Sequence, residues 1–384
     1  MAVMTGKFPG GCCTNIQHYS DRIECTPEVS PQALKTGMTN GHHEWRGLLW
    51  GEEGEQVHIV IHWPPFDPEK VDRTANEYWF VESFVGVAAD IVFAGTDELT
   101  WTRLETGVRR DGWDIHIDVA LPAGGKLYLS VNLPFTLKAL EKLCEEFRDY
   151  RFSLGKTAGG LDIPAFRFGT GKRAIWLQAN QHVTEIGGCY VLWSHMRELV
   201  KPETDLKDFS FFVVPSISVD KMIGDGHYPE LKENINRDWL EFHQPETRAI
   251  SSYIRSLAED GYTMLVMTDM HNGWCRPEDS GGNITEYNHG FIDNEYWERR
   301  VKYTRAVLAA LDYENPEKIW WHDRSVPRTF ERYGSETYKA YSSTYEFSRF
   351  QLWDREKGAY VPISQEGLMK IGRQYAKFLL SYDF

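Results

Sequence analysis

The stretch "RAIWLQANQHVTEIGG", residues 173–188, decides the fold. Its apolar run over 173–179 predicts a buried strand, and the segment 184–199 predicts a helix. His182 lies in the loop between them, and Glu185 is expected in the first helical turn. The sequence therefore puts an imidazole and a carboxylate, three residues apart, where a strand gives way to a helix.

A pair of this spacing is weak evidence by itself. With 13 His and 56 acidic residues in the chain, about two His-x-x-acid pairs are expected by chance. Taken alone, His182 and Glu185 are more simply interpreted as hydrogen-bonded polar residues. A metal site would also need a third ligand, a general base and a substrate anchor in a suitable structural setting.

The composition limits the class of protein. A length of 384 residues favours two domains, and 42% hydrophobic with 26% charged residues is typical of a soluble globular protein. The formal net charge of −14 argues against binding of nucleic acid or of an anionic membrane, because both need a basic surface. The aromatic share of 14% fits large cores, and equally an interface in a homo-oligomer.

Targeting signals and cysteine usage point to the cytoplasm. We find no apolar run long enough to span a membrane, and the first residues lack the apolar region of a signal peptide. The six cysteines have no C-x-x-C spacing, so free thiols in a reducing compartment are expected. The protein is therefore predicted to be cytoplasmic.

The first third of the chain predicts a β-rich domain. Residues 1–45 lack periodicity and are expected to form an irregular arm. Over 46–135, apolar and polar residues alternate in short runs separated by turn signals, which predicts an antiparallel β-sandwich. The runs are "QVHIVIHW" (56–63), "EYWFVESF" (77–84), "DIHIDVAL" (114–121) and "KLYLSVNL" (126–133).

Residues 136–384 predict an α/β domain with a mixed sheet and helices on both faces. It opens with a helix in the stretch 134–147, and Thr136 is the expected N-cap of this helix. Strands and helices then alternate, and functional sites in such sheets collect beyond the carboxyl ends of the strands. The strands are expected at 163–169, 173–179, 208–215 and 262–270, and the helices at 184–199, 245–260, 296–313 and 364–382.

Further polar residues follow other predicted strands. His271 ends the strand 262–270, and two His with one carboxylate are a usual ligand set of a catalytic zinc ion. The neighbours Asn236 and Arg237 could hold a carboxylate, while Glu346 lies in the β-type run "SSTYEFSRF". Each of these residues alone is better interpreted as an ordinary hydrogen-bonded or surface residue.

The order of these motifs over roughly residues 150–384 resembles the zinc carboxypeptidase family of metallopeptidases. The β-rich segment before them is similar to the layout of the cytosolic carboxypeptidase branch, which carries a β-sandwich ahead of its catalytic domain. The resemblance implies hydrolysis of a C-terminal peptide bond by a zinc-activated water. It implies that one zinc ion per chain is bound by His182, Glu185 and His271, that Glu346 is the general base, and that Asn236 and Arg237 hold the substrate carboxylate.

The sequence departs from the family pattern at two positions. Asn234 stands where the family usually has an Asp that supports a zinc-binding His. The family's oxyanion-stabilising Arg is missing from its usual place, where the nearest residue is His227, and Arg276 or Arg349 could also fill the role. The Tyr that closes over substrate in the family has Tyr333 and Tyr338 as its candidates, of which Tyr338 is carried forward, and either residue is equally well interpreted as part of the core.

These departures leave three functions open. The first is a metallocarboxypeptidase acting on a peptide with a free carboxylate. The second is an N-acyl amino acid deacylase or a small-metabolite amidohydrolase that uses the same chemistry. The third is an inactive binding module that keeps the carboxypeptidase fold, against which the intact set of ligands and base argues.

Overall fold

The computed structural model describes residues 1–27, 45–63, 91–182, 185–222, 235–272, 283–287, 294–311, 320–322, 329–348 and 351–384. The chain divides into two compact units. The first is built mainly from Met1–Ala139, and the second from Leu140–Asp220, Leu231–Trp274 and Glu278–Phe384.

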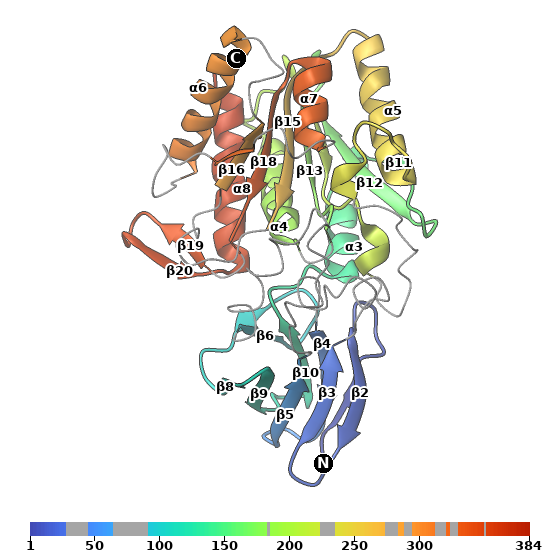
Figure 1. The fold of residues 1–384 in the computed structure, drawn as a ribbon, viewed down its shortest axis with the longest axis vertical. Coiled ribbons are helices and arrows are strands. Elements are labelled where there is room, and N and C mark those ends of the chain that lie inside the picture. The colour runs from blue at the N-terminus through green and yellow to red at the C-terminus, as the bar shows by residue number, and fades with distance from the viewer. Residues whose placement is uncertain are drawn as a thin grey trace. The chain divides into compact units, whose positions relative to one another are not determined.

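The first unit consists of two five-stranded sheets (Figure 1). One sheet has the order β1 (Val3–Thr5), β4 (Trp45–Trp50), β10 (Lys126–Val131), β6 (Val92–Gly95) and β7 (Thr102–Arg103). The other has the order β2 (Cys13–His18), β3 (Ile23–Pro27), β5 (Gln56–His62), β9 (Asp114–Ala120) and β8 (Val108–Asp111).

The alternation of apolar residues explains how these sheets pack. β5 and β9 are antiparallel, and Ile59 pairs with Ile117 in a register that buries both side chains. They share one core cluster with Leu49 and Leu129 of the other sheet. Two sheets that bury their inner faces against each other form a sandwich, as the sequence predicts.

The irregular arm predicted for residues 1–45 is wrong for its described part. Residues 3–5, 13–18 and 23–27 are strands that belong to the sandwich. Their alternation is carried by residues such as Ile23 and Cys25, which are buried, but each strand is too short to give a clear periodic signal. The strand β3 also pairs with β5 in parallel, so the sandwich is not wholly antiparallel. The predicted strand 77–84 lies outside the described residues.

The second unit is built on an eight-stranded mixed sheet. Its centre is parallel, with β13 (Arg173–Ala179) between β14 (Phe209–Val214) and β15 (Thr263–His271), and β18 (Tyr341–Glu346) next to β15. The full order is β11 (Arg151–Lys156), β12 (Asp162–Phe168), β14, β13, β15, β18, β16 (Asn283–Tyr287) and β17 (Trp320–His322). Every residue of β13 except Arg173 is buried, as expected for a strand covered on both faces.

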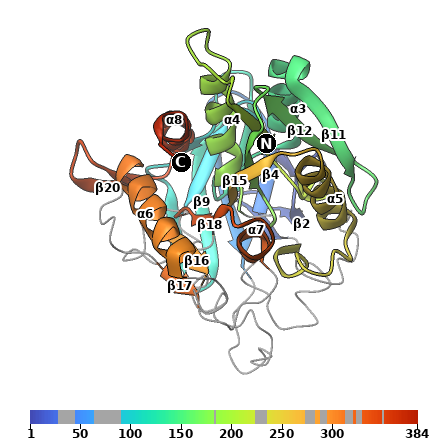
Figure 2. The same cartoon turned by 90° about the horizontal axis from the view of Figure 1, so that it is seen from above.

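Helices cover both faces of this sheet (Figure 2). The helices α4 (Gly187–Leu199), α6 (Asn294–Ala310) and α8 (Gln365–Ser381) lie on one face (Figure 2), where α8 contacts both α4 and α6. The helices α5 (Pro245–Glu259) and α7 (Phe330–Tyr338) lie on the other. The mixed α/β fold predicted for this part of the chain is therefore confirmed.

Several local predictions can be checked in detail. The helix α3 (Leu137–Glu146) has Thr136 as its N-cap, whose hydroxyl accepts a hydrogen bond of 3.1 Å from the amide of Ala139. The helix α4 begins at Gly187, so Glu185 precedes the helix and does not lie in its first turn, contrary to the prediction. The five cysteines that the structure describes are free thiols.

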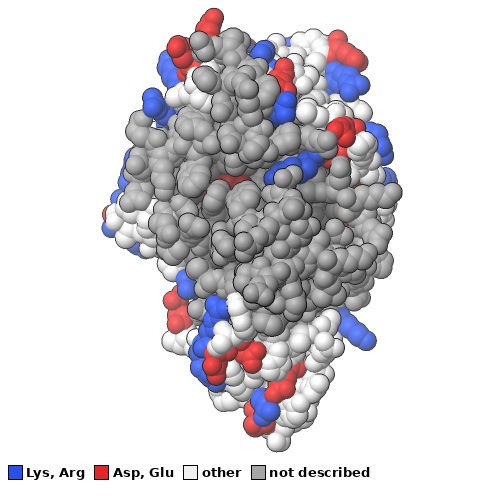
Figure 3. Space-filling view, viewed as in Figure 1, with Lys and Arg blue, Asp and Glu red and all other residues white. Residues whose placement is uncertain are grey.

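The described surface carries charges of both signs (Figure 3). In the part of the face that Figure 3 describes, lysine and arginine side chains alternate with aspartate and glutamate. Within the described ranges, no helix is long and apolar enough to cross a membrane.

Candidate metal centre

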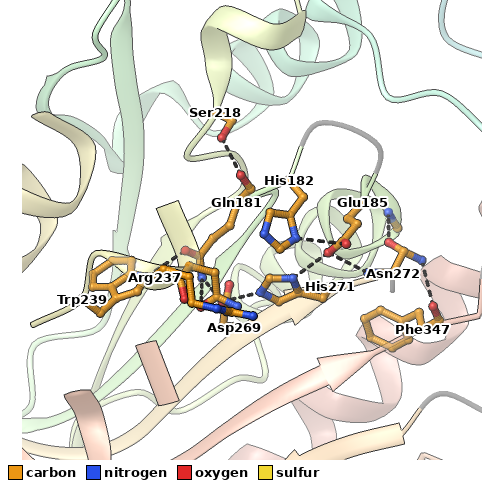
Figure 4. A network of polar contacts seen from close by, with 12 residues as sticks. Gln181, His182, Glu185, Ser218, Arg237, Trp239, Asp269, His271, Asn272 and Phe347 are labelled. Carbon is orange, nitrogen blue, oxygen red and sulfur yellow. Dashed lines mark hydrogen bonds and ion pairs between the residues drawn. The ribbon is translucent and has the colours of Figure 1, made fainter. Parts of the chain in front are cut away.

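Three polar side chains from separate segments meet beyond the carboxyl ends of β13 and β15. His182 follows β13, Glu185 lies just before α4, and His271 is the last residue of β15. One candidate ligand atom from each residue can be chosen so that all lie within 4.8 Å of one another. Figure 4 shows the three side chains pointing toward one another. This is the only group of three such ligands among the residues that the structure describes.

The two imidazoles approach opposite oxygens of one carboxylate. Nδ1 of His182 lies 3.0 Å from Oε1 of Glu185, and Nδ1 of His271 lies 2.6 Å from Oε2. Glu185 and His271 are almost fully buried, whereas the His182 side chain is 12% exposed. His182 is therefore the one member of the three that keeps some exposure.

Asp269 fixes the orientation of the His271 ring. Its Oδ2 atom lies 2.6 Å from Nε2 of His271, so Nδ1 is the nitrogen left for a metal. The amide of Gln181 donates a hydrogen bond to the same oxygen, and its own carbonyl accepts one of 2.8 Å from the indole of Trp239. A buried carboxylate, amide and indole thus hold the ring in one position.

Asn272 connects the beginning of α4 to the end of β15. Its backbone amide donates to Oε2 of Glu185 over 3.3 Å, and its side-chain oxygen accepts a bond of 2.5 Å from the amide of Gly187. A β-carbon at Gly187 would lie 2.5 Å from the Asn272 side chain, which any larger residue would displace. Gly187 is therefore needed for the close contact between the start of α4 and Asn272.

The charges of the cluster stabilise one another. Burial would raise the pKa of the Glu185 carboxyl, but His182 and His271 outweigh burial and hold that pKa well below its usual range. Burial would lower the pKa of His271, yet Asp269 and Glu185 raise it well above the ordinary value. The buried carboxylates therefore favour a positive charge on or between the two imidazoles.

The donor set fits a divalent transition metal. Two imidazole nitrogens and a carboxylate are the protein ligands of many catalytic metal sites, in which a further position stays open. Nδ1 of His271 faces the cluster because Asp269 holds Nε2, and Glu185 offers an oxygen to each side. His182, Glu185 and His271 could therefore hold a metal ion.

The predicted base and anchor lie on neighbouring elements. Glu346 is the half-buried last residue of β18, in register with His271 on the adjacent parallel strand. Asn236 and Arg237 end a 3-10 helix, Ile235–Arg237, in which Asn236 is buried. The amide nitrogen of Gln181 lies 3.4 Å from Oδ1 of Asn236, which connects the predicted anchor to the candidate metal ligands.

Other predicted site residues are placed less simply. His227, Asn234, Arg276 and Arg349 lie outside the described residues. Tyr338 ends α7, and its hydroxyl lies 3.0 Å from that of the buried Tyr333. The Tyr338 ring also packs against the core cluster of the second unit, so the residue has a structural role whether or not it closes over a ligand.

The sequence analysis missed three residues that complete the centre, Asp269, Gln181 and Asn272. A signal existed for Asp269, because residues two apart on a strand point to the same face and Asp269 precedes His271 by two. Gln181 and Asn272 are neighbours of the histidines along the chain, but neutral amides carry no distinctive pattern. Their roles follow only from the folded structure.

Solved structures that resemble this protein align with nearly the whole chain. No family model matches the sequence, and no curated protein matches it. Among solved structures, a metallo-carboxypeptidase from Burkholderia cenocepacia aligns with a TM-score of 0.73 and 15% identity, covering 99% of this chain and 98% of that one. A metallo-carboxypeptidase from Pseudomonas aeruginosa, solved with (2-guanidinoethylmercapto)succinic acid, aligns with a TM-score of 0.73 and 16% identity, covering 98% of each chain. This chain therefore has the fold of the metallo-carboxypeptidases.

Proposed function

We propose that this protein is a zinc-dependent hydrolase that cleaves the amide bond next to a free carboxylate, as a carboxypeptidase does. The observation that carries the proposal is the convergence of His182, Glu185 and His271, whose candidate ligand atoms lie within 4.8 Å of one another. The carboxypeptidase fold supports the same reading, because these residues lie beyond strand ends, where sites of open α/β sheets form.

Zinc suits the donor set of two imidazoles and one carboxylate. When bound, a zinc ion lowers the pKa of water towards neutrality and polarises a carbonyl group. The protein contributes the orientation of its ligands, since Asp269 holds one face of the His271 ring. It also closes the site around Glu185, which excludes bulk water from the buried side.

Glu346 acts as the general base in this proposal. Its carboxylate accepts a proton from the attacking water and delivers it to the leaving nitrogen. The carbonyl carbon thereby gains a bond to the water oxygen and loses its bond to nitrogen. The register of Glu346 with His271 supports this role. A half-buried carboxylate at the end of a strand can reach solvent and substrate alike.

Arg237 and Asn236 hold the substrate carboxylate. A guanidinium group can bind a carboxylate with two parallel hydrogen bonds, and an amide adds a further donor. The Pseudomonas aeruginosa protein is solved with a succinic acid derivative, which carries carboxyl groups, and this supports a carboxylate-bearing substrate here. Both C-terminal peptides and N-acyl amino acids meet that requirement.

The first test is the metal content of the protein purified without added metal. We expect about one zinc per chain. After removal of zinc by a chelator, hydrolysis of peptides and N-acyl amino acids should cease and should return when zinc is restored. A protein that neither contains nor takes up zinc would overturn the proposal.

A further inference from the structure

A second pair of histidines lies on the outer face of the β-sandwich unit, away from its core. His58 is on β5 and His116 is on β9, two adjacent antiparallel strands whose alternate residues fill the core. Both histidines are partly exposed. The proposed hydrolysis uses neither of them.

Asp118 determines which nitrogen of His58 carries a proton. Its Oδ1 atom lies 2.6 Å from Nδ1 of His58, and a carboxylate can only accept a hydrogen bond at that distance. The proton of neutral His58 is therefore on Nδ1. The other nitrogen, Nε2, presents a lone pair.

The partner nitrogen, Nδ1 of His116, has two contacts that cannot both be satisfied while both imidazoles are neutral. Nδ1 of His116 lies 3.1 Å from Nη2 of Arg109, which can only donate, and 3.3 Å from Nε2 of His58. If Arg109 donates to Nδ1 of His116, that nitrogen carries a lone pair. This lone pair then faces the lone pair on Nε2 of neutral His58 across 3.3 Å. If instead His116 donates to His58, the Arg109 contact is repulsive. A positive charge between the two nitrogens, either a second proton on Nε2 of His58 or a bound metal ion, resolves this conflict.

The separation of the nitrogens matches a metal site. Two nitrogen ligands of a tetrahedral zinc ion, each about 2.0–2.1 Å from the metal, lie about 3.3–3.4 Å apart. The contact of Asp118 with the far nitrogen of His58 is also the arrangement in which a carboxylate fixes the tautomer of a metal-binding histidine.

We propose that His58 and His116 form a second, peripheral site for a divalent transition-metal ion of the zinc type, with Asp118 as the supporting carboxylate. Two protein ligands leave the other positions to water, so this site binds more weakly than the cluster around His271. A bound ion joins β5 to β9 and stabilises the sandwich by an amount that grows with the logarithm of the free metal concentration above the dissociation constant. Arg109 competes with the ion for Nδ1 of His116.

Two further observations fit this proposal. Burial, Arg109 and His58 lower the pKa of His116, which keeps its imidazole neutral and able to bind metal at neutral pH. The chain as a whole has a net charge of −14, which favours cations over anions at its surface.

The test is a zinc titration of the full chain in which His182→Ala and His271→Ala together remove the first site. Calorimetry should report one remaining equivalent of bound zinc. His58→Ala or His116→Ala, added to that background, should abolish it, and Asp118→Asn should weaken it about tenfold. Arg109→Ala should strengthen it. Circular dichroism would confirm that each variant is folded.

His62→Ala is the matched control. His62 lies on the same face of the same strand and contacts Asp114 at 3.1 Å, but it is not one of the pair. Its loss should leave the zinc equivalent in place. An equal loss of zinc binding in the His58, His116 and His62 variants would mean adsorption to surface histidines only, which overturns the proposal. Zinc binding that is unchanged without His58 and His116 would overturn it as well. So would the absence of any second bound equivalent in the parent of these variants.

Discussion

Oδ2 of Asp269 lies 2.6 Å from Nε2 of His271, so a buried carboxylate supports the candidate metal ligand from behind. The same oxygen accepts a hydrogen bond from Gln181. The family resemblance implies a supporting Asp at position 234, where this chain has Asn. The carboxylate that the structure places against a candidate metal ligand is that of Asp269. It supports His271 directly.

Asp269→Asn should weaken zinc binding about 10- to 100-fold, the usual effect of losing a supporting carboxylate. A neutral amide can still accept a hydrogen bond but polarises the imidazole less. Competition with a chromogenic chelator measures the affinity directly. Asp162→Asn, which alters a more exposed carboxylate on β12, is the control and should leave the zinc affinity unchanged. Unchanged affinity in Asp269→Asn would show that the contact does not tune the metal.

Gln181→Met should impair both halves of the site. The substitution keeps the length of the side chain but removes the donors to Asp269 and Asn236. We expect roughly tenfold weaker zinc binding together with a higher KM, because the anchor loses its connection to the metal cluster. Steady-state kinetics at saturating zinc separates the two effects. A fall in kcat alone, with KM and zinc affinity intact, would contradict the positioning role.

The candidate site illustrates what the sequence can predict. The convergence of His182 and His271 follows from their places after two buried strands, because neighbouring parallel strands end at the same edge of a sheet. The start of α4 could not be located to the residue, because Glu185 is held by Asn272 and His271 and not by helical hydrogen bonds. That difference depends on tertiary contacts.

The helix α7 shows why other elements were missed. Gly334 lies inside it, and glycine costs about 1 kcal/mol relative to alanine in a helix. A β-carbon at Gly334 would lie 2.5 Å from the hydroxyl of Ser342 on β18, so the glycine allows the helix to approach the sheet. Tertiary packing here overrides a local preference that argues against a helix.

Glu346→Gln should leave zinc bound and remove most hydrolysis. The amide keeps the shape of the side chain but cannot accept the proton, and a general base usually contributes about 10²- to 10⁴-fold in rate. Metal analysis and turnover measured on the same sample separate binding from chemistry. Near-normal turnover in Glu346→Gln would eliminate the assigned base.

Arg237→Ala should raise KM for substrates with a free carboxylate, because the bidentate partner of that group is lost. The matched substrate is the same peptide with a C-terminal carboxamide, which cannot form the ion pair. The variant and the parent should differ little on the carboxamide. An equal loss on both substrates would mean that Arg237 supports the fold and does not hold the carboxylate.

His195 should make the fold sensitive to acid. It is fully buried on α4 between the rings of Phe211 and Tyr375, and burial lowers its pKa to about 3. An unfolded chain takes up this proton near pH 6.5, so between these two pH values the unfolded state binds more protons. The free energy of unfolding then falls as the pH falls, by roughly 1.4 kcal/mol per pH unit at most. His195→Phe should remove that slope in urea titrations from pH 6 downwards, whereas His243→Ala, which alters an exposed histidine, should keep it. The same slope in His195→Phe would show that other groups cause the loss of stability in acid.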